Sequence, residues 1–132
     1  MKKILLVEDD RHLQFLIKEE LMEDGYEVTT ASNGVEALSM IQAEISYEPD
    51  LIILDIRMSK MDGFETMGHI LKSRLDSPII IHSAYSGYRE HPLTMAAEAY
   101  IVKSHDFTSL KATISDVLEK RDMPHERQAA TA

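Results

Sequence analysis

Three carboxylates and one ammonium group lie directly after short apolar runs of this sequence: Glu8, Asp9, Asp55 and Lys103. A buried run should not end on an unpaired charge, because a charge removed from water without a partner is costly. Carboxylate ligands without thiolates or paired histidines suit a hard cation such as Mg²⁺, which often shares its ligand shell with a phosphate. An ammonium group beside them could bind a phosphoryl oxygen. These residue types therefore indicate phosphoryl chemistry assisted by Mg²⁺.

Asp55 is the residue that we expect to react, because it is the lone acid on the central run "LIIL". A carboxylate can itself attack phosphorus and form an acyl phosphate. Two carboxylates about 5 Å apart repel by about 3 kcal/mol at an effective dielectric constant near 20, so a cluster of them is unfavourable until a cation binds. Ser83 lies two residues after the run "III" and offers a hydroxyl donor to a phosphoryl oxygen. We predict a phosphoryl-acceptor site at Asp55.

These side chains must be brought together by the elements that precede them. Five apolar runs are predicted to be strands: Ile4–Val7, Val28–Ala31, Leu51–Leu54, Ile79–Ile81 and Tyr100–Val102. Between them, apolar residues recur every three or four positions, which is typical of helices, with Leu13–Leu21, Val35–Ile45, Phe64–Leu71 and Phe107–Leu118 as the periodic stretches. The alternation predicts βαβ units and an α/β fold with a parallel sheet buried on both faces. The reactive side chains should then meet at the carboxyl edge of that sheet.

Local signals predict where some helices begin and end. Asp10 and Asp106 are expected as N-caps, and Gly25 as a C-terminal stop. The segment Gly87–Ala97 contains a glycine, a proline and few apolar positions, so we expect a short or mobile element there. Residues 122–132 have little to bury, and we expect a flexible tail.

Size and composition restrict the class of protein. A chain of 132 residues fits one domain, which we place at residues 1–121, with 44% hydrophobic residues to form its core. The absence of cysteine excludes thiol catalysis and fits a reducing, cytoplasmic compartment. A net charge of −9 argues against direct binding of nucleic acid. No apolar run approaches the ~20 residues of a membrane span, so we expect no membrane insertion.

Four blocks, "ILLVEDD", "PDLIILDIRMSKMDG", "IIIHSA" and "AYIVKS", occur in this order between residues 4 and 104, and the resemblance that they carry covers about residues 3–120. Together they resemble the signature blocks of response regulator receiver domains. The resemblance implies a flavodoxin-like, three-layer α/β/α fold with a doubly wound sheet in the order 2-1-3-4-5. It implies two-component or phosphorelay signalling by a stand-alone receiver, in which Asp55 takes a phosphoryl group from a histidine kinase or phosphotransfer protein. The domain would not be an enzyme, and its output would come from docking to a downstream protein target.

The same resemblance implies roles for individual residues. Asp9 and Asp55 would bind Mg²⁺ directly, together with the backbone carbonyl of Arg57, and Glu8 would act through a water molecule. Lys103 and Ser83 would contact the phosphoryl group. Ser83 would also act as a switch with Tyr100, the aromatic position whose side chain turns inward. From its position two residues after Ser83, Tyr85 could cover the site and slow attack by water.

The chain departs from the family pattern in three places. Ser59 and Ser104 stand where prolines are usual, so the Lys103–Ser104 bond could be cis or trans. The spacing from Ser83 to Lys103 is 20 positions (103 − 83), about two shorter than expected, and the shortening falls in Gly87–Ala97. These departures predict an unusual surface for partners.

Three alternatives stay open on the sequence. A degenerate receiver would keep the acids and act as a protein-interaction scaffold without phosphorylation. A haloacid-dehalogenase-type phosphatase also places an aspartate after a strand, but it needs a second acid two residues later, where this chain has Arg57. A flavin-binding protein of the same fold would need a phosphate loop, and no such glycine-rich motif is present. The six histidines lack metal-ligand spacing, and only His82 lies beside a predicted site residue.

Overall fold

The computed structural model describes residues 1–43, 47–73 and 75–123. The described elements are β1 (Lys3–Val7), α1 (Arg11–Glu23), β2 (Glu27–Ala31), α2 (Gly34–Ala43), β3 (Leu51–Leu54), α3 (Gly63–Lys72), β4 (Ile79–Ser83), the 3₁₀ helices η1 (Gly87–Glu90) and η2 (Pro92–Ala96), β5 (Ala99–Val102) and α4 (Thr108–Asp122). All five predicted strands are confirmed, each within two residues of its expected ends. Ile45, the last apolar residue of the periodic stretch Val35–Ile45, lies outside the described residues.

The strands form one parallel sheet in the order β2-β1-β3-β4-β5, which confirms the predicted topology. β1 lies between β2 and β3, so Val7 is paired with both Ala31 and Leu54. All residues of β3 are buried, as the unbroken apolar run predicts for a strand covered on both faces. The strand order reverses between β1 and β3, so the edge beyond their carboxyl ends is the expected place for a ligand.

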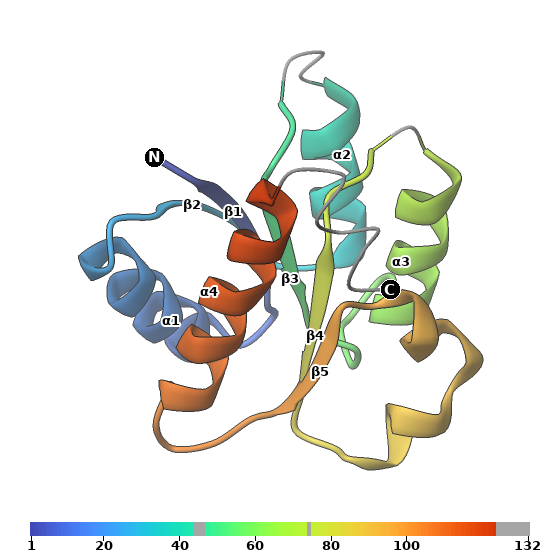
Figure 1. Ribbon diagram of the computed structural model, residues 1–132. Helices are drawn as coiled ribbons and strands as arrows, with labels where there is room; N and C mark the ends of the chain where they lie inside the picture. Colours follow the sequence, from blue (N-terminus) through green and yellow to red (C-terminus); the bar gives the residue numbers. More distant parts are fainter. Residues whose placement is uncertain (44–46, 74, 124–132) are drawn as a thin grey trace.

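Two hydrophobic cores lie on opposite faces of the sheet, and Figure 1 shows the helices that cover each face. α1 and α4 cover one face, where Ile17 and Ile114 are completely buried against alternate residues of the central strands. α2 and α3 cover the other face, where Ala37 and Met67 are completely buried against the remaining strand residues. The three-layer α/β/α arrangement is therefore as predicted.

The helix ends follow local chemistry with one exception. The Asp10 carboxylate caps α1 by accepting a hydrogen bond from the Leu13 amide at 3.1 Å, and Gly25 follows α1 with a φ of +91°. Both expectations are confirmed. The expectation for α4 is wrong, since its N-cap is Phe107. The Asp106 carboxylate instead accepts from Thr108 N at 3.1 Å, only two residues on, so it stabilises the turn before the helix.

The segment between β4 and β5 contains two 3₁₀ turns in place of an α-helix, which confirms the short element expected at Gly87–Ala97. Pro92 opens η2, where a missing amide hydrogen is tolerated. His91 lies between the two turns; its Nδ1 accepts from Leu93 N at 3.1 Å, and its ring stacks on Phe64 of α3 at 3.7 Å between centroids. The segment is thus tied to α3 by aromatic packing.

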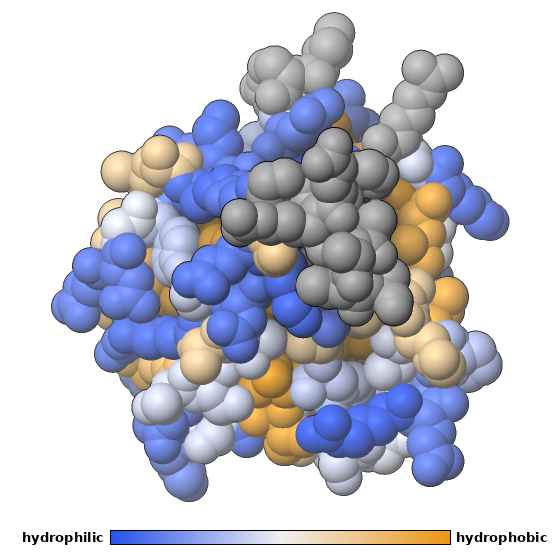
Figure 2. Space-filling view, viewed as in Figure 1, coloured by the Kyte–Doolittle hydropathy of each residue, from blue (hydrophilic) through white to orange (hydrophobic). Residues whose placement is uncertain are grey.

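Polar residues cover much of the face shown in Figure 2, with hydrophobic areas as separate patches between them. Among the described residues, no helix is both long enough and apolar enough to span a bilayer. α4 continues to Asp122, whose carboxylate pairs with Lys2 at 2.7 Å. The rest of the tail expected after the domain, residues 124–132, lies outside the described residues.

Candidate functional site

Three carboxylates meet at the carboxyl edge of the sheet. One oxygen each of Glu8, Asp9 and Asp55 lies within 4.8 Å of the others, although the residues come from the ends of β1 and β3. Glu8 is 1% exposed and Asp55 5% exposed, whereas Asp9 is open to solvent. The parallel pairing of Val7 with Leu54 places the two strand ends side by side, so this convergence follows directly from the register.

Lys103 forms ion pairs with two of these carboxylates. Its Nζ lies 3.0 Å from Glu8 Oε1 and 3.1 Å from Asp55 Oδ2. The backbone of Lys103 is fixed by its amide, which donates to Ser83 O at 2.8 Å and so continues the pairing of β5 with β4. The sequence predicted Lys103 as a partner for a phosphoryl oxygen; the structure adds its pairing with Glu8, which nothing in the sequence signals.

Burial perturbs the ionisation of Glu8, Asp55 and Lys103. Burial, and then the charge of Asp55, raise the pKa of Glu8 to about 7. Burial also raises the pKa of Asp55, although the Lys103 ammonium opposes this shift. Burial alone would lower the pKa of Lys103, but its contacts with Glu8 and Asp55 outweigh burial and raise it. The site therefore holds excess negative charge whose full ionisation is unfavourable, which is the condition that a bound cation relieves.

The loop between β3 and α3 holds Asp55 in place. The amide of Ile56 donates to Asp55 Oδ1 at 2.8 Å, and Gly63 N donates to Ile56 O at 2.7 Å. A Cβ on Gly63 would lie 2.2 Å from the backbone oxygen of Asp55, so only glycine allows this approach. In the sequence Gly63 is only the last residue of the block "PDLIILDIRMSKMDG". Its contact with the acceptor residue is visible only in three dimensions.

Ser83 and Tyr100 lie on neighbouring strands next to the cluster. Ser83 is the buried last residue of β4, and its Oγ accepts from Tyr85 N at 3.2 Å. The Tyr100 hydroxyl donates to the backbone oxygen of Tyr85, and Arg89 lies over the Tyr100 ring at 4.9 Å from its centroid. Tyr85 therefore links both residues that were predicted to act as a switch.

The Arg57 guanidinium lies over the Tyr85 ring, 4.9 Å from its centroid. Together these two side chains join the loop after β3 to the loop after β4, next to the acceptor. Arg57 is exposed and Tyr85 is 49% exposed, so the pair lies at the surface of the site. The Lys103–Ser104 peptide bond is trans, as are all the described peptide bonds.

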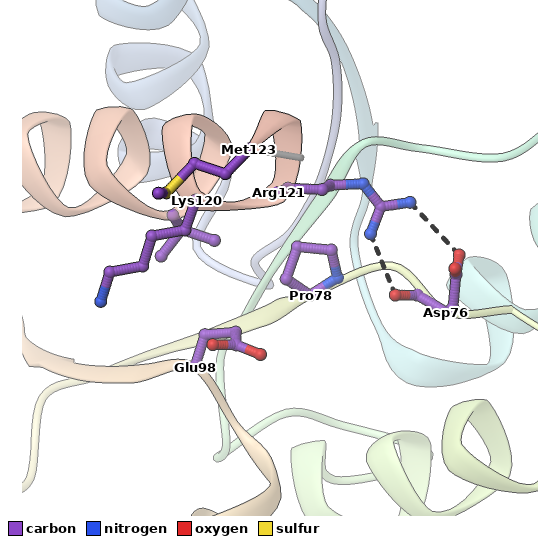
Figure 3. A pocket seen from close by; sticks show the side chains of 7 residues that line it. Asp76, Pro78, Glu98, Lys120, Arg121 and Met123 are labelled. Carbon is purple, nitrogen blue, oxygen red and sulfur yellow. Dashed lines mark hydrogen bonds and ion pairs between the residues drawn. The ribbon is translucent and has the colours of Figure 1, made fainter. Parts of the chain in front are cut away.

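Cavities of about 450 and 360 Å³ flank the cluster. The first is lined by Leu13, Lys103, Ser104 and His105, and the second by Ile56, Arg57, Met58, Asp62, Phe64 and Tyr88. Another cavity of about 450 Å³ lies at the opposite end of the sheet, where Pro78 and Glu98 precede β4 and β5 and Arg121 reaches Asp76 (Figure 3). That cavity is remote from the carboxylates and does not belong to the candidate site.

The donor set fits a hard divalent cation. Three carboxylates within 4.8 Å offer only oxygen ligands, and the exposed Asp9 gives access from solvent. A phosphoryl group on Asp55 would lie beside the ammonium of Lys103. The arrangement can therefore bind a cation, neutralise phosphoryl oxygens and present a carboxylate nucleophile at one place.

Comparison with known proteins identifies relatives of the chain. The sequence model of the response regulator receiver domain matches residues 4–115. The "Probable transcriptional regulator ycf27" of Porphyra purpurea is 37% identical over 123 residues, which make up 92% of this chain and 49% of that protein. The alkaline phosphatase synthesis transcriptional regulatory protein PhoP of Bacillus subtilis is 32% identical over 124 residues, 92% of this chain and 50% of that protein. The chain spans about half the length of these curated relatives.

Solved structures agree with the sequence comparison. The response regulator TrrA of Thermotoga maritima, crystallised with Mg²⁺-BeF, is 44% identical, with a TM-score of 0.82 over 89% of this chain and 99% of that chain. A structure of TrrA in complex with the histidine kinase ThkA gives 45% identity and a TM-score of 0.79 over the same shares of the two chains.

Proposed function

Because the chain belongs to the response regulator receiver domain family, we propose that it accepts a phosphoryl group on Asp55 and thereby changes the face that it offers to partners. The observation that carries this proposal is the meeting of Glu8, Asp9, Asp55 and Lys103 at one edge of the sheet. The phosphoryl donor would be a histidine kinase or a phosphotransfer protein. The phosphorylated domain would then bind a downstream target protein.

Mg²⁺ is the cofactor that we propose. Asp9 and Asp55 would bind it directly, with the backbone carbonyl of Arg57, and Glu8 would act through a water molecule. When bound, the ion would neutralise the phosphoryl oxygens and the carboxylates together. The related TrrA was crystallised with Mg²⁺-BeF, which supports this assignment.

In the proposed reaction an Asp55 carboxylate oxygen forms a bond to phosphorus as the P–N bond of a phosphohistidine breaks. The donor imidazole carries a proton on its other ring nitrogen, so it leaves with the electron pair of the broken P–N bond as neutral imidazole. Asp55 is fixed for this attack by the Ile56 amide, and Lys103 lies where it can neutralise the phosphoryl charge. The complex of TrrA with the histidine kinase ThkA supports a kinase as donor.

The proposed switch starts at Ser83. Its hydroxyl would turn from Tyr85 N toward a phosphoryl oxygen, which would release the loop whose backbone oxygen holds the Tyr100 hydroxyl. The face that changes would include η1, η2 and β5. The paired side chains of Arg57 and Tyr85 would cover the site and slow the attack of water on the acyl phosphate.

The decisive experiment is intact-mass analysis after incubation with Mg²⁺ and acetyl phosphate. We expect one added phosphoryl group on the wild type and none on Asp55→Asn, which keeps the size of the side chain and removes the nucleophile. Asp9→Asn should take up the group slowly, because it retains Asp55 but weakens the metal site. A phosphoryl group on Asp55→Asn, or none on the wild type, would contradict the proposal.

The other functions considered have less support. A scaffold would have no need for the partly buried ion pairs of Lys103 with Glu8 and Asp55. Arg57 occupies the position where a phosphatase of the haloacid dehalogenase type needs its second acid, so we propose that the domain catalyses only its own phosphorylation and dephosphorylation. Failure to turn over phosphate monoesters would agree with this. A kinase donor and the cysteine-free sequence both favour the cytoplasm as the site of action.

A further inference from the structure

His82 is a buried histidine that the proposed reaction leaves without a role. It is 2% exposed, and its Nδ1 has no hydrogen-bond partner within the described part of the chain. Buried polar groups without partners are uncommon because each loses its bonds to water and gains nothing in return. This nitrogen therefore needs an explanation beyond packing.

The strand register places His82 diagonally across from Lys103. Side chains alternate along β4, so His82 faces the same side as Ile80, which packs in the core under α1 and α4. His82 pairs with Ile101 of β5, and Lys103 follows Ile101 by two residues on the same face. Neighbours on such a diagonal are within reach of a long side chain.

The hydrogen-bonding capacities of the two side chains are complementary. A lysine ammonium has three donors, and two of them are directed to Glu8 and Asp55. Burial, and then the charge of Lys103, lower the pKa of His82 to about 4. The imidazole is consequently neutral near pH 7 and can accept a hydrogen bond, and the nearby ammonium has a donor to give.

We propose that His82 is a positioning residue for Lys103, in which Nδ1 accepts an N–H of the ammonium group once Asp55 is phosphorylated. This inference rests on the proposed function of the site. An acyl phosphate takes the negative charge from the Asp55 oxygen that Lys103 now binds, and the cation competes for Glu8. His82 is a fixed acceptor that remains, and it directs the ammonium group toward the phosphoryl oxygens.

Two substitutions separate positioning from packing. His82→Leu removes the acceptor and fills the core, whereas His82→Asn keeps an oxygen close to the place of Nδ1. In titrations of the full chain with beryllium fluoride and Mg²⁺, we expect roughly tenfold weaker binding for His82→Leu and near wild-type binding for His82→Asn. Thermal denaturation without the additives should show His82→Leu at least as stable as the wild type, since the unpartnered nitrogen is gone.

A spectroscopic measurement tests the contact directly. In ¹⁵N NMR of histidine-labelled protein, the His82 Nδ1 resonance should move toward that of a hydrogen-bonded acceptor when beryllium fluoride and Mg²⁺ are added. An unmoved resonance, unchanged affinity of His82→Leu, or equal losses in both variants would overturn the inference while leaving the proposed function intact. Failure of the wild type itself to bind beryllium fluoride or take up phosphoryl would overturn both.

Discussion

The close approach of α3 to the acceptor residue provides a demanding test of the structure. Gly63, the first residue of α3, is buried, and a Cβ there would lie 2.2 Å from Asp55 O and 2.7 Å from Ile56 Cα. Both atoms belong to the backbone, so no side chain can turn away to make room. Gly68 lies in the same helix, and a Cβ on it would meet nothing within 4 Å.

The two glycines should therefore respond to alanine in opposite directions. Overpacking of a well-packed site costs about 1–3 kcal/mol, which we expect for Gly63→Ala. Alanine is a better helix former than glycine by about 0.5–1 kcal/mol, so Gly68→Ala should be more stable than the wild type by that amount. The free energies of unfolding of the two variants should differ by about 1.5–4 kcal/mol.

Urea denaturation followed by far-UV circular dichroism measures these free energies, and the phosphorylation rate with acetyl phosphate shows whether Asp55 has moved. Gly63→Ala should react more slowly than the wild type even in conditions where it is fully folded, while Gly68→Ala should react normally. If Gly63→Ala were as stable and as reactive as the wild type, the described packing of α3 against the acceptor loop would be wrong.

Three further predictions test the cover of the site, its electrostatics and the core. Tyr85→Ala should speed loss of the phosphoryl group severalfold by admitting water, as followed by intact mass over time; an unchanged lifetime would remove the proposed cover. Because the pKa of Glu8 is raised from 4.5 to about 7, its contribution to stability is fully present below pH 4.5 and is lost as the pH rises through about 7. Mg²⁺ should therefore raise the melting temperature more at about pH 8 than at about pH 6, and equal shifts would argue against a buried, protonated Glu8. Ile114→Ala should destabilise the domain by about 2–5 kcal/mol in urea, against a change within about 0.5 kcal/mol for the exposed Ser115→Ala, and similar values for both would contradict the described core.

Much of the fold could be predicted because it depends on patterns within short stretches of chain. The apolar runs and the helical periodicity fixed the alternation of elements, and the ordered signature blocks implied the strand order. Burial of single helix residues was harder to foresee. Leu16 and Ile17 both fit the apolar periodicity of α1, yet Ile17 is completely buried and Leu16 is 38% exposed. The difference depends on how the helix is rotated against the sheet.

The sequence by itself determined which residues could carry the chemistry, since carboxylates, a hydroxyl and a lysine follow strands whose ends share one edge. Only the tertiary structure decided how those groups interact. The Lys103 ammonium pairs with both Glu8 and Asp55, Gly63 presses against the backbone of the acceptor, and His82 lies buried without a partner for Nδ1. These contacts join residues far apart in the chain, and their strength depends on burial and on distances of a few ångströms. The burial of these groups and the distances between them are set only when the sheet and its helices are packed together.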